Sequence, residues 1–152
     1  QPYMVALMTE VLCAGGRDKI LEIGTGSGYQ AAVLAETCRE VYTIERKEHL
    51  LDNARETLSG AGYGNIFFKC ADGTKGWEEK APFDGIIVTA AAPGIPESLK
   101  DQLADGGRLV MPVGPRFSQV LVAVDREGSS FTEENICGCV FVPLIGDEGC
   151  DG

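Results

Sequence analysis

Hydrophobic and polar positions alternate along the chain in a way that predicts helices and strands in turn. Residues 2–12 carry apolar side chains at helical spacing, with Pro2 in the first turn and Gly15-Gly16 ending the helix. Short β-branched runs predict the strands, and the longer segments between them predict crossover helices. We expect strands at 19–23, 41–44, 66–70, 83–88 and 108–112, and further helices at 29–38, 47–58 and 96–103.

The pattern changes after residue 112. Residues 119–125 and 131–143 both look like strands, and the turn signal at 126–129 leaves no room for a helix between them, which predicts an antiparallel hairpin. Crossover-linked strands followed by a hairpin favour an α/β fold: a doubly wound, mostly parallel, Rossmann-like sheet with an antiparallel C-terminal hairpin. A length of 152 residues suits one domain over 1–152.

Composition narrows the possible partners. The 13 basic and 23 acidic residues give a net charge of −10, and no basic cluster offers a face for phosphate backbones, so nucleic acid is not an expected partner. No apolar run is long enough to span a membrane. The six cysteines are mostly widely spaced and several lie in apolar runs, which favours free thiols in a reducing cytoplasm over disulfides or a metal site. We expect a monomer.

A glycine-rich turn between the first strand and the next helix is the strongest local motif. Residues 21–30 read LEIGTGSGYQ, with glycines at 24, 26 and 28. Ligands bind at the carboxyl ends of parallel strands, where this turn lies. The dinucleotide motif G-x-G-x-x-G needs a glycine at 29, where this chain has Tyr29. The G-x-G-x-G spacing instead resembles the nucleoside-binding loop of class I methyltransferases.

Two acidic positions follow the next strands at the same edge of the predicted sheet. Glu45 can accept hydrogen bonds from both hydroxyls of a ribose, although a strand-end acid on the surface is the alternative. Asp72 can accept from an adenine amino group, with Gly73 allowing the ring close to the backbone. The alternative is that Asp72-Gly73 is a plain turn.

The segment after the fourth strand is made of small residues. It reads Thr-Ala-Ala-Ala-Pro at 89–93 and lacks the D/N-P-P-Y/F element of methyltransferases that act on exocyclic amines. Small side chains leave room for a peptide backbone, and their amides could bind an oxygen anion. A merely compact loop is the alternative.

Several segments, in order, resemble the protein-L-isoaspartate O-methyltransferase family. They are QPYMVALM at 1–8, LEIGTGSGYQAAVLAE at 21–36, APFDGIIVTAAAP at 81–93, GGRLVMPVG at 106–114 and VFVPL at 140–144. The resemblance implies transfer of the methyl group of S-adenosyl-L-methionine to the free carboxyl of L-isoaspartyl residues, and less well of D-aspartyl residues, in damaged proteins. The ester then collapses to a succinimide, whose hydrolysis restores some normal aspartate.

The resemblance also assigns roles to residues. It implies that the cofactor is held by Glu22, Gly24, Thr25, Gly26, Ser27, Gly28, Glu45, Arg46, Asp72 and Gly73. It implies a substrate cleft at Gln1, Pro2, Thr89, Ala90, Ala91, Pro112, Val113 and Gly114. The family's usual active-site serine would stand just before Gln1, so the resemblance assigns no catalytic residue within these 152 residues, and we expect weak cofactor binding and poor methylation from them.

Two alternatives stay open from the sequence. A cofactor-binding but catalytically inactive methyltransferase-like protein would also carry the glycine loop and Glu45. An NAD-dependent oxidoreductase would share the strand, loop and helix, but Tyr29 in place of glycine and the lack of a second nucleotide-binding half argue against it.

Overall fold

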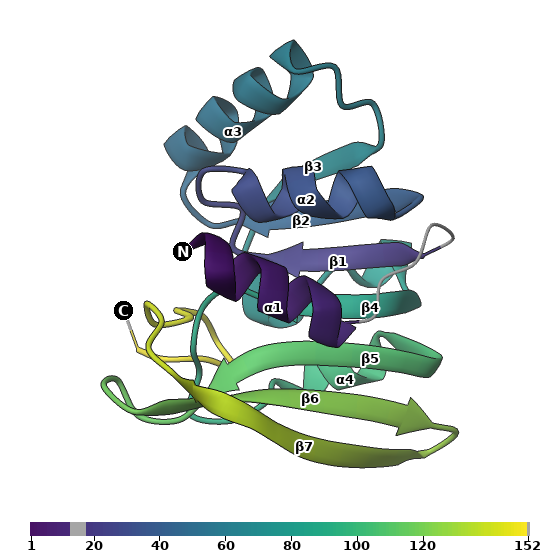
Figure 1. Ribbon diagram of the computed structural model, residues 1–152, viewed down its shortest axis with the longest axis vertical. Helices are drawn as coiled ribbons and strands as arrows, with labels where there is room; N and C mark the ends of the chain where they lie inside the picture. Colours follow the sequence, from purple (N-terminus) through teal and green to yellow (C-terminus); the bar gives the residue numbers. More distant parts are fainter. Residues whose placement is uncertain (13–17, 152) are drawn as a thin grey trace.

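A computed structural model describes residues 1–12 and 18–151, in which a seven-stranded sheet carries helices on both faces (Figure 1). The strands are β1 Lys19–Ile23, β2 Glu40–Glu45, β3 Ile66–Cys70, β4 Phe83–Val88, β5 Leu103–Val113, β6 Gln119–Glu127 and β7 Ser130–Cys139. The helices are α1 Pro2–Leu12, α2 Tyr29–Thr37, α3 Glu48–Gly60 and α4 Glu97–Asp101, with 3₁₀ turns η1 Gly73–Lys75 and η2 Glu78–Lys80.

The strand order is β3-β2-β1-β4-β5-β6-β7. Strands β1 to β5 are parallel, whereas β6 runs antiparallel to both β5 and β7. The doubly wound, mostly parallel sheet with an antiparallel C-terminal hairpin is therefore confirmed. The carboxyl ends of the parallel strands meet at the edge where α1 begins (Figure 1). Ligands bind at such an edge because the chain changes direction there and leaves crevices between loops.

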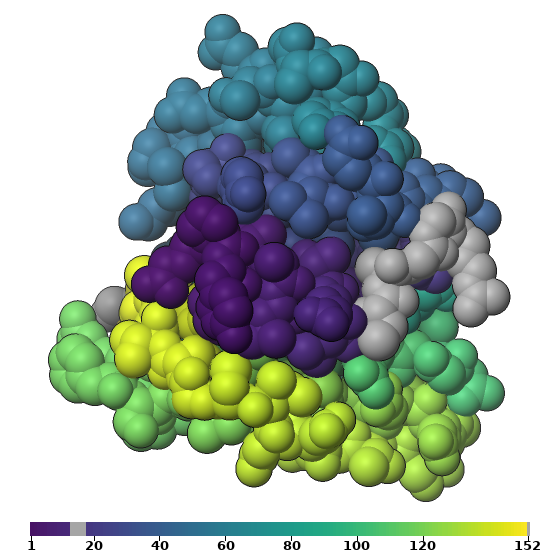
Figure 2. Space-filling view, in the orientation of Figure 1, coloured from purple at the N-terminus to yellow at the C-terminus, as the bar shows by residue number. Residues whose placement is uncertain are grey.

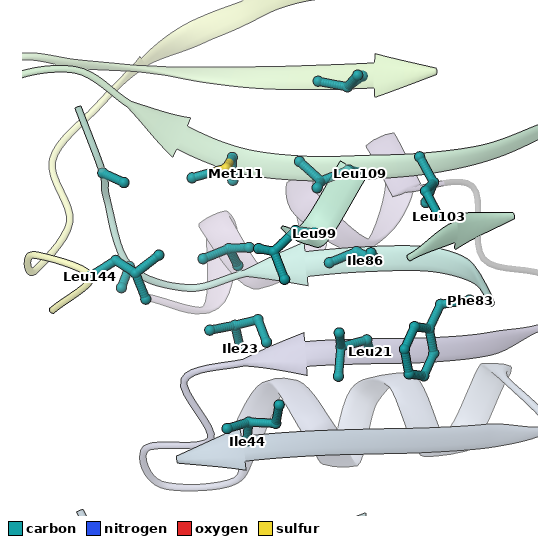
Figure 3. Close-up of a cluster of buried hydrophobic side chains, with 14 of the residues drawn as sticks. Leu21, Ile23, Ile44, Phe83, Ile86, Leu99, Leu103, Leu109, Met111 and Leu144 are labelled. Atoms are coloured by element: carbon teal, nitrogen blue, oxygen red, sulfur yellow. The ribbon is translucent and has the colours of Figure 1, made fainter. Parts of the chain in front are cut away.

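Two hydrophobic clusters lie on opposite faces of the sheet. Helices α1 and α2 cover one face, where Met8, Leu34 and Val110 are buried together. Helix α4 covers the other, where Leu99 packs with Leu21 and other strand residues (Figure 3). Each fully buried aliphatic side chain of this kind contributes about 1.5–3 kcal/mol. These clusters fix the strands, and hence the positions of the loops at the carboxyl edge.

Three strands and the first helix have the bounds that the sequence predicts: β1, β3, β4 and α1. The expected end of α1 at Gly15-Gly16 lies outside the described residues. The predicted helix at 96–103 was too long, because Leu103 already pairs with Phe83 and starts β5. The next pair is Gly85 with Arg108, so the residues between Leu103 and Arg108 bulge out of the ladder.

The hairpin turn is tighter than predicted. Glu127 pairs with Ser130, so the turn is Gly128-Ser129 rather than 126–129, and the φ of +61° at Gly128 suits a glycine. The predicted strand at 131–143 was also wrong at its end, because β7 stops at Cys139.

The segment after β7 crosses back to the carboxyl edge. Ala91 donates a backbone hydrogen bond to Val142 (2.8 Å), and Leu144 donates one to Ala91 (2.7 Å). Leu144 is thereby buried in the cluster under α4. The segment 140–144 therefore becomes a wall of the loop region, not an extension of the hairpin.

The described cysteines carry free thiols: Cys38, Cys70, Cys137, Cys139 and Cys150. Cys13 lies outside the described residues. Within residues 1–12 and 18–151, no helix has the length and apolar character needed to cross a bilayer.

Candidate functional site

The glycine loop between β1 and α2 depends on its glycines. Gly24, Gly26 and Gly28 have φ values of +95°, +53° and +83°, a region that other residues adopt only at a cost. Gly24 donates a backbone hydrogen bond to Ile44 (2.8 Å), which ties the loop to the end of β2. A Cβ on Gly24 would lie 2.5 Å from Oγ1 of Thr89. The loop can therefore lie this close to the segment after β4 because residue 24 is a glycine.

Glu45, at the end of β2, points its carboxylate at this loop. Its Oε2 accepts a hydrogen bond from the Gly26 amide (3.1 Å), and its Oε1 accepts one from the Lys47 amide (3.1 Å). Glu45 is 8% exposed. Each oxygen of an ionised carboxylate can accept about two hydrogen bonds, so both retain acceptor capacity toward a ligand. Arg46, the next residue, is exposed.

A chain of buried polar groups lies beneath the loop. The hydroxyl of Thr25 is 2.6 Å from that of Thr43, which donates to Oε2 of Glu22 (2.5 Å). The pKa of Glu22 is raised to about 8: burial raises it most, the Thr43 hydrogen bond partly offsets this, and the nearby charge of Glu45 adds to the rise. Sequence reasoning missed Thr43, although a threonine in the buried strand β2 is a signal for a polar partner nearby.

Asp72 caps the short turn η1. Its Oδ1 accepts from both the amide and the hydroxyl of Thr74 (2.9 and 2.8 Å), and its Oδ2 accepts from the Asp147 amide (2.9 Å). Burial alone would raise the pKa of Asp72, but these hydrogen bonds and the charge of Lys75 outweigh it and hold that pKa below its usual range. Asp72 therefore also anchors the C-terminal segment, a contact that the sequence did not predict.

Gly73 allows the backbone after β3 to approach β1. A Cβ there would lie 2.4 Å from Cγ2 of Ile23, so a larger residue would force the turn after β3 away from β1 at their carboxyl ends. The sequence-based interpretation gave Gly73 the task of admitting a ligand ring. The structure shows that Gly73 also admits the Ile23 side chain, and its place beside a ligand ring stays a prediction.

A cavity of about 1080 Å³, the larger of two that border the carboxyl edge of the described sheet, opens beside the glycine loop. Four loop residues (24–27) line it together with Gln1, Pro2 and Thr89, three of the expected cleft residues. Residues 138–142 and 117–119 form the opposite wall. Figure 2 shows the C-terminal segment lying beside the N-terminal helix on this face of the molecule.

The other expected cleft residues lie behind that wall. Ala90 and Ala91 are buried, and the amides of Ala91 and Ala92 donate to Val142 and Pro112. The room left by these small side chains is filled by residues 142–144 of the chain itself, so the amide of Ala91 has no hydrogen to offer an anion. Pro112, Val113 and Gly114 lead into the loop at 115–118 that borders the cavity; Gly114 donates to the Ala92 carbonyl (2.9 Å).

A second cavity, of about 760 Å³, lies at the end of β3 and is lined by Arg46, Cys70, Asp72 and Gly146, among others. Because the strand order is β3-β2-β1-β4, Asp72, Glu45, the glycine loop and Thr89 follow one another along the sheet edge. Gly26, which donates to Glu45, lines the larger cavity, and Arg46, the residue after Glu45, lines the second. This arrangement suits one elongated ligand that meets hydrogen-bond acceptors of the protein along its length.

Residues 1–149 match the family model for protein-L-isoaspartate(D-aspartate) O-methyltransferase. The chain belongs to this family. It is 56% identical to the protein-L-isoaspartate O-methyltransferase of Dictyoglomus thermophilum and 58% identical to that of Geobacter metallireducens. Each alignment covers 98% of this chain, and they cover 68% and 69% of the two relatives, respectively. The family match decides against the NAD-dependent oxidoreductase alternative.

Solved structures of the family share the fold. One protein-L-isoaspartate O-methyltransferase superposes with a TM-score of 0.90 at 27% identity, and the alignment covers 98% of this chain and 49% of that one. This chain thus spans about half the length of that protein. A Plasmodium falciparum structure solved with S-adenosyl-L-homocysteine has a TM-score of 0.81 at 24% identity, covering 95% of this chain and 74% of that one.

Proposed function

We propose that this chain binds S-adenosyl-L-methionine along the carboxyl edge of its sheet and methylates the free carboxyl of L-isoaspartyl, and less efficiently D-aspartyl, residues in damaged proteins. The observation that carries the proposal is the pairing of the Gly26 amide with the Glu45 carboxylate at the mouth of a positive-φ glycine loop. Family membership supports the reaction class. The bound S-adenosyl-L-homocysteine of the Plasmodium relative supports the choice of cofactor.

The donor and acceptor groups fit the parts of this cofactor. Glu45 offers two adjacent oxygens, each with acceptor capacity left, which matches the two hydroxyls of a ribose. Asp72 uses about three of its four acceptor positions within the chain, so Oδ2 keeps one for an adenine amino group. Gly24 to Ser27 and Thr89 line the larger cavity, where the methionine end would lie.

The cofactor supplies a methyl group activated on a positively charged sulfur. The acceptor needs no general base, because a carboxyl with a pKa near 4 is already an anion at neutral pH. The protein's part is to align the reacting groups in line and to exclude water from the anion. Among the described residues, none that lines the larger cavity carries an ionised side chain, so an incoming carboxylate meets no repelling acid in this lining.

We propose proteins, not nucleic acids, as the substrates, because the net charge of −10 opposes phosphate backbones. The free thiols of the described cysteines support a reducing compartment such as the cytoplasm. The single domain and the monomeric state stay predictions, and light scattering of the purified chain tests the second.

Calorimetric titration with S-adenosyl-L-methionine and NADH, followed by transfer of a tritiated methyl group to an isoaspartyl peptide, tests the proposed function. We expect binding of the first ligand only, and a base-labile methyl ester on the isoaspartyl peptide but not on its aspartyl counterpart. Binding without any ester would support the inactive-binder alternative. Absence of S-adenosyl-L-methionine binding would refute the proposal.

A further inference from the structure

Large apolar side chains stand exposed around the mouth of the larger cavity. Phe117 is 80% exposed, Val142 69%, Val140 68% and Tyr29 53%, and all four line the cavity. They come from the loop after β5, the segment after β7 and the first turn of α2. We call these four residues the apolar rim. An exposed apolar patch beside a binding site marks a surface that a partner covers.

The apolar rim is held in place by a buried side chain. Gln119, 3% exposed, donates from Nε2 to the carbonyls of Pro115 (3.0 Å) and Arg116 (2.9 Å). Its Oε1 accepts from the Phe141 amide (2.6 Å). One amide group therefore ties the loop that carries Phe117 to the segment that carries Val140 and Val142. With both its nitrogen and its oxygen hydrogen-bonded, this buried amide gives the rim a fixed geometry.

The described lining of the cavity carries no charged side chain, although the protein is acidic. Its lining, as far as the structure describes it, holds no Asp, Glu, Lys or Arg, although 24% of the chain is charged. Its volume of about 1080 Å³ also exceeds the range of about 300–1,000 Å³ in which most small-molecule sites fall. The cavity thus has room for more than the methionine end of a cofactor, and the additional surface is apolar.

We propose that the apolar rim is a substrate subsite for an aliphatic or aromatic side chain adjacent to the isoaspartyl residue, with Phe117 as its main contact. This inference rests on the proposed function and names a preference within its substrate class. The apolar rim borders the same cavity as the glycine loop and Thr89. A peptide that places its carboxyl in this cavity would therefore bring a neighbouring side chain against the rim.

Binding of two fluorescein-labelled isoaspartyl peptides, measured by anisotropy with S-adenosyl-L-homocysteine present, tests the subsite. The peptides differ only in having Leu or Ser beside the isoaspartyl residue. We expect the full chain to bind the Leu peptide about tenfold more tightly, since burying a Leu side chain against the rim removes apolar surface from water. In Phe117→Ser this preference should fall to less than about threefold, because the main apolar contact is gone.

Phe131→Ser is the matched control. Phe131 is also an exposed phenylalanine (37%) with an arginine, Arg126, over its ring, but it lies at the hairpin end of β7. Phe117 has the guanidinium of Arg116 over its ring in the same way. The control variant should keep the full preference for the Leu peptide, and thermal unfolding should show both variants folded.

Equal affinity of the unmodified chain for the two peptides, or a preference that survives in Phe117→Ser, would overturn the subsite. The failure of the proposed function has a different signature: the chain would not distinguish isoaspartyl from aspartyl peptides, or would not bind S-adenosyl-L-homocysteine. A chain that binds neither peptide would refute both.

Discussion

Thr43 donates a 2.5 Å hydrogen bond to Oε2 of Glu22, at a point where Glu22 has no exposed surface. Among the described residues, the other oxygen of Glu22, Oε1, has no hydrogen-bond partner. A carboxylate in this position loses most of its hydration and gains only one donor. The folded protein therefore favours the protonated form, which is why the pKa of Glu22 rises to about 8.

The first prediction is that Glu22→Gln flattens the dependence of stability on pH. Between the ordinary pKa of 4.5 and the folded pKa of about 8, the folded state holds a proton that the unfolded state has lost. Rising pH therefore destabilises the folded protein over this window, by on the order of a few kcal/mol in total, and not beyond it. The glutamine side chain of the variant cannot titrate, so the variant should gain stability relative to the parent as pH rises.

Urea unfolding at mildly acidic, neutral and mildly alkaline pH measures this effect. Glu48→Gln, in the exposed first turn of α3, is the control and should follow the parent at each pH. A difference between Glu22→Gln and the parent that stays constant across the three conditions would contradict the raised pKa.

The second prediction concerns Glu45. Glu45→Ala should weaken S-adenosyl-L-methionine binding by about 1.5–3 kcal/mol, roughly 10- to 150-fold, because a charged acceptor for the ribose is lost. Isothermal titration calorimetry measures the affinity. Glu40→Ala, at the other end of the same strand, should bind like the parent. Equal affinities in the two variants would remove Glu45 from the cofactor site.

The third prediction is that Asp72→Ala has two separable effects. The loss of the acceptor should weaken cofactor binding. The loss of the cap on Thr74 and of the contact with the Asp147 amide should also lower stability by about 1 kcal/mol. Amide hydrogen exchange should quicken at Asp147, while the Glu45→Ala variant leaves that amide unchanged. Unchanged exchange at Asp147 would show that Asp72 does not anchor the C-terminal segment.

Helices and strands that depend on the local pattern of residues could be predicted from the sequence, whereas contacts between segments far apart in the chain could not. The strand predicted at 19–23 coincides with β1, which is buried from Ile20 to Ile23. The start of β5 at Leu103 depends on its pairing with Phe83, which no local signal encodes. The same holds at the site: the glycine spacing predicts the loop, but not that its neighbours Ala90 and Ala91 are covered by the chain's own residues 142–144.

The final prediction tests whether Gln119 positions the apolar rim or only stabilises the fold. Gln119→Met removes the three hydrogen bonds that join the loop at 115–118 to Phe141, and should cost about 1–3 kcal/mol of stability. Because the apolar rim then loses its fixed geometry, the preference for the Leu peptide over the Ser peptide should fall to less than about threefold. Cofactor affinity should change little, since Gln119 makes its hydrogen bonds to none of the residues assigned to the cofactor.

Gln102→Met is the control for this prediction. Gln102 is also buried (7% exposed), accepts from the Trp77 amide (2.7 Å) and donates to the Lys75 carbonyl (2.8 Å), but it does so away from the larger cavity. Its variant should lose comparable stability and keep the peptide preference. If both variants lose stability and both keep the full preference for the Leu peptide, Gln119 supports the fold alone and the rim does not depend on it.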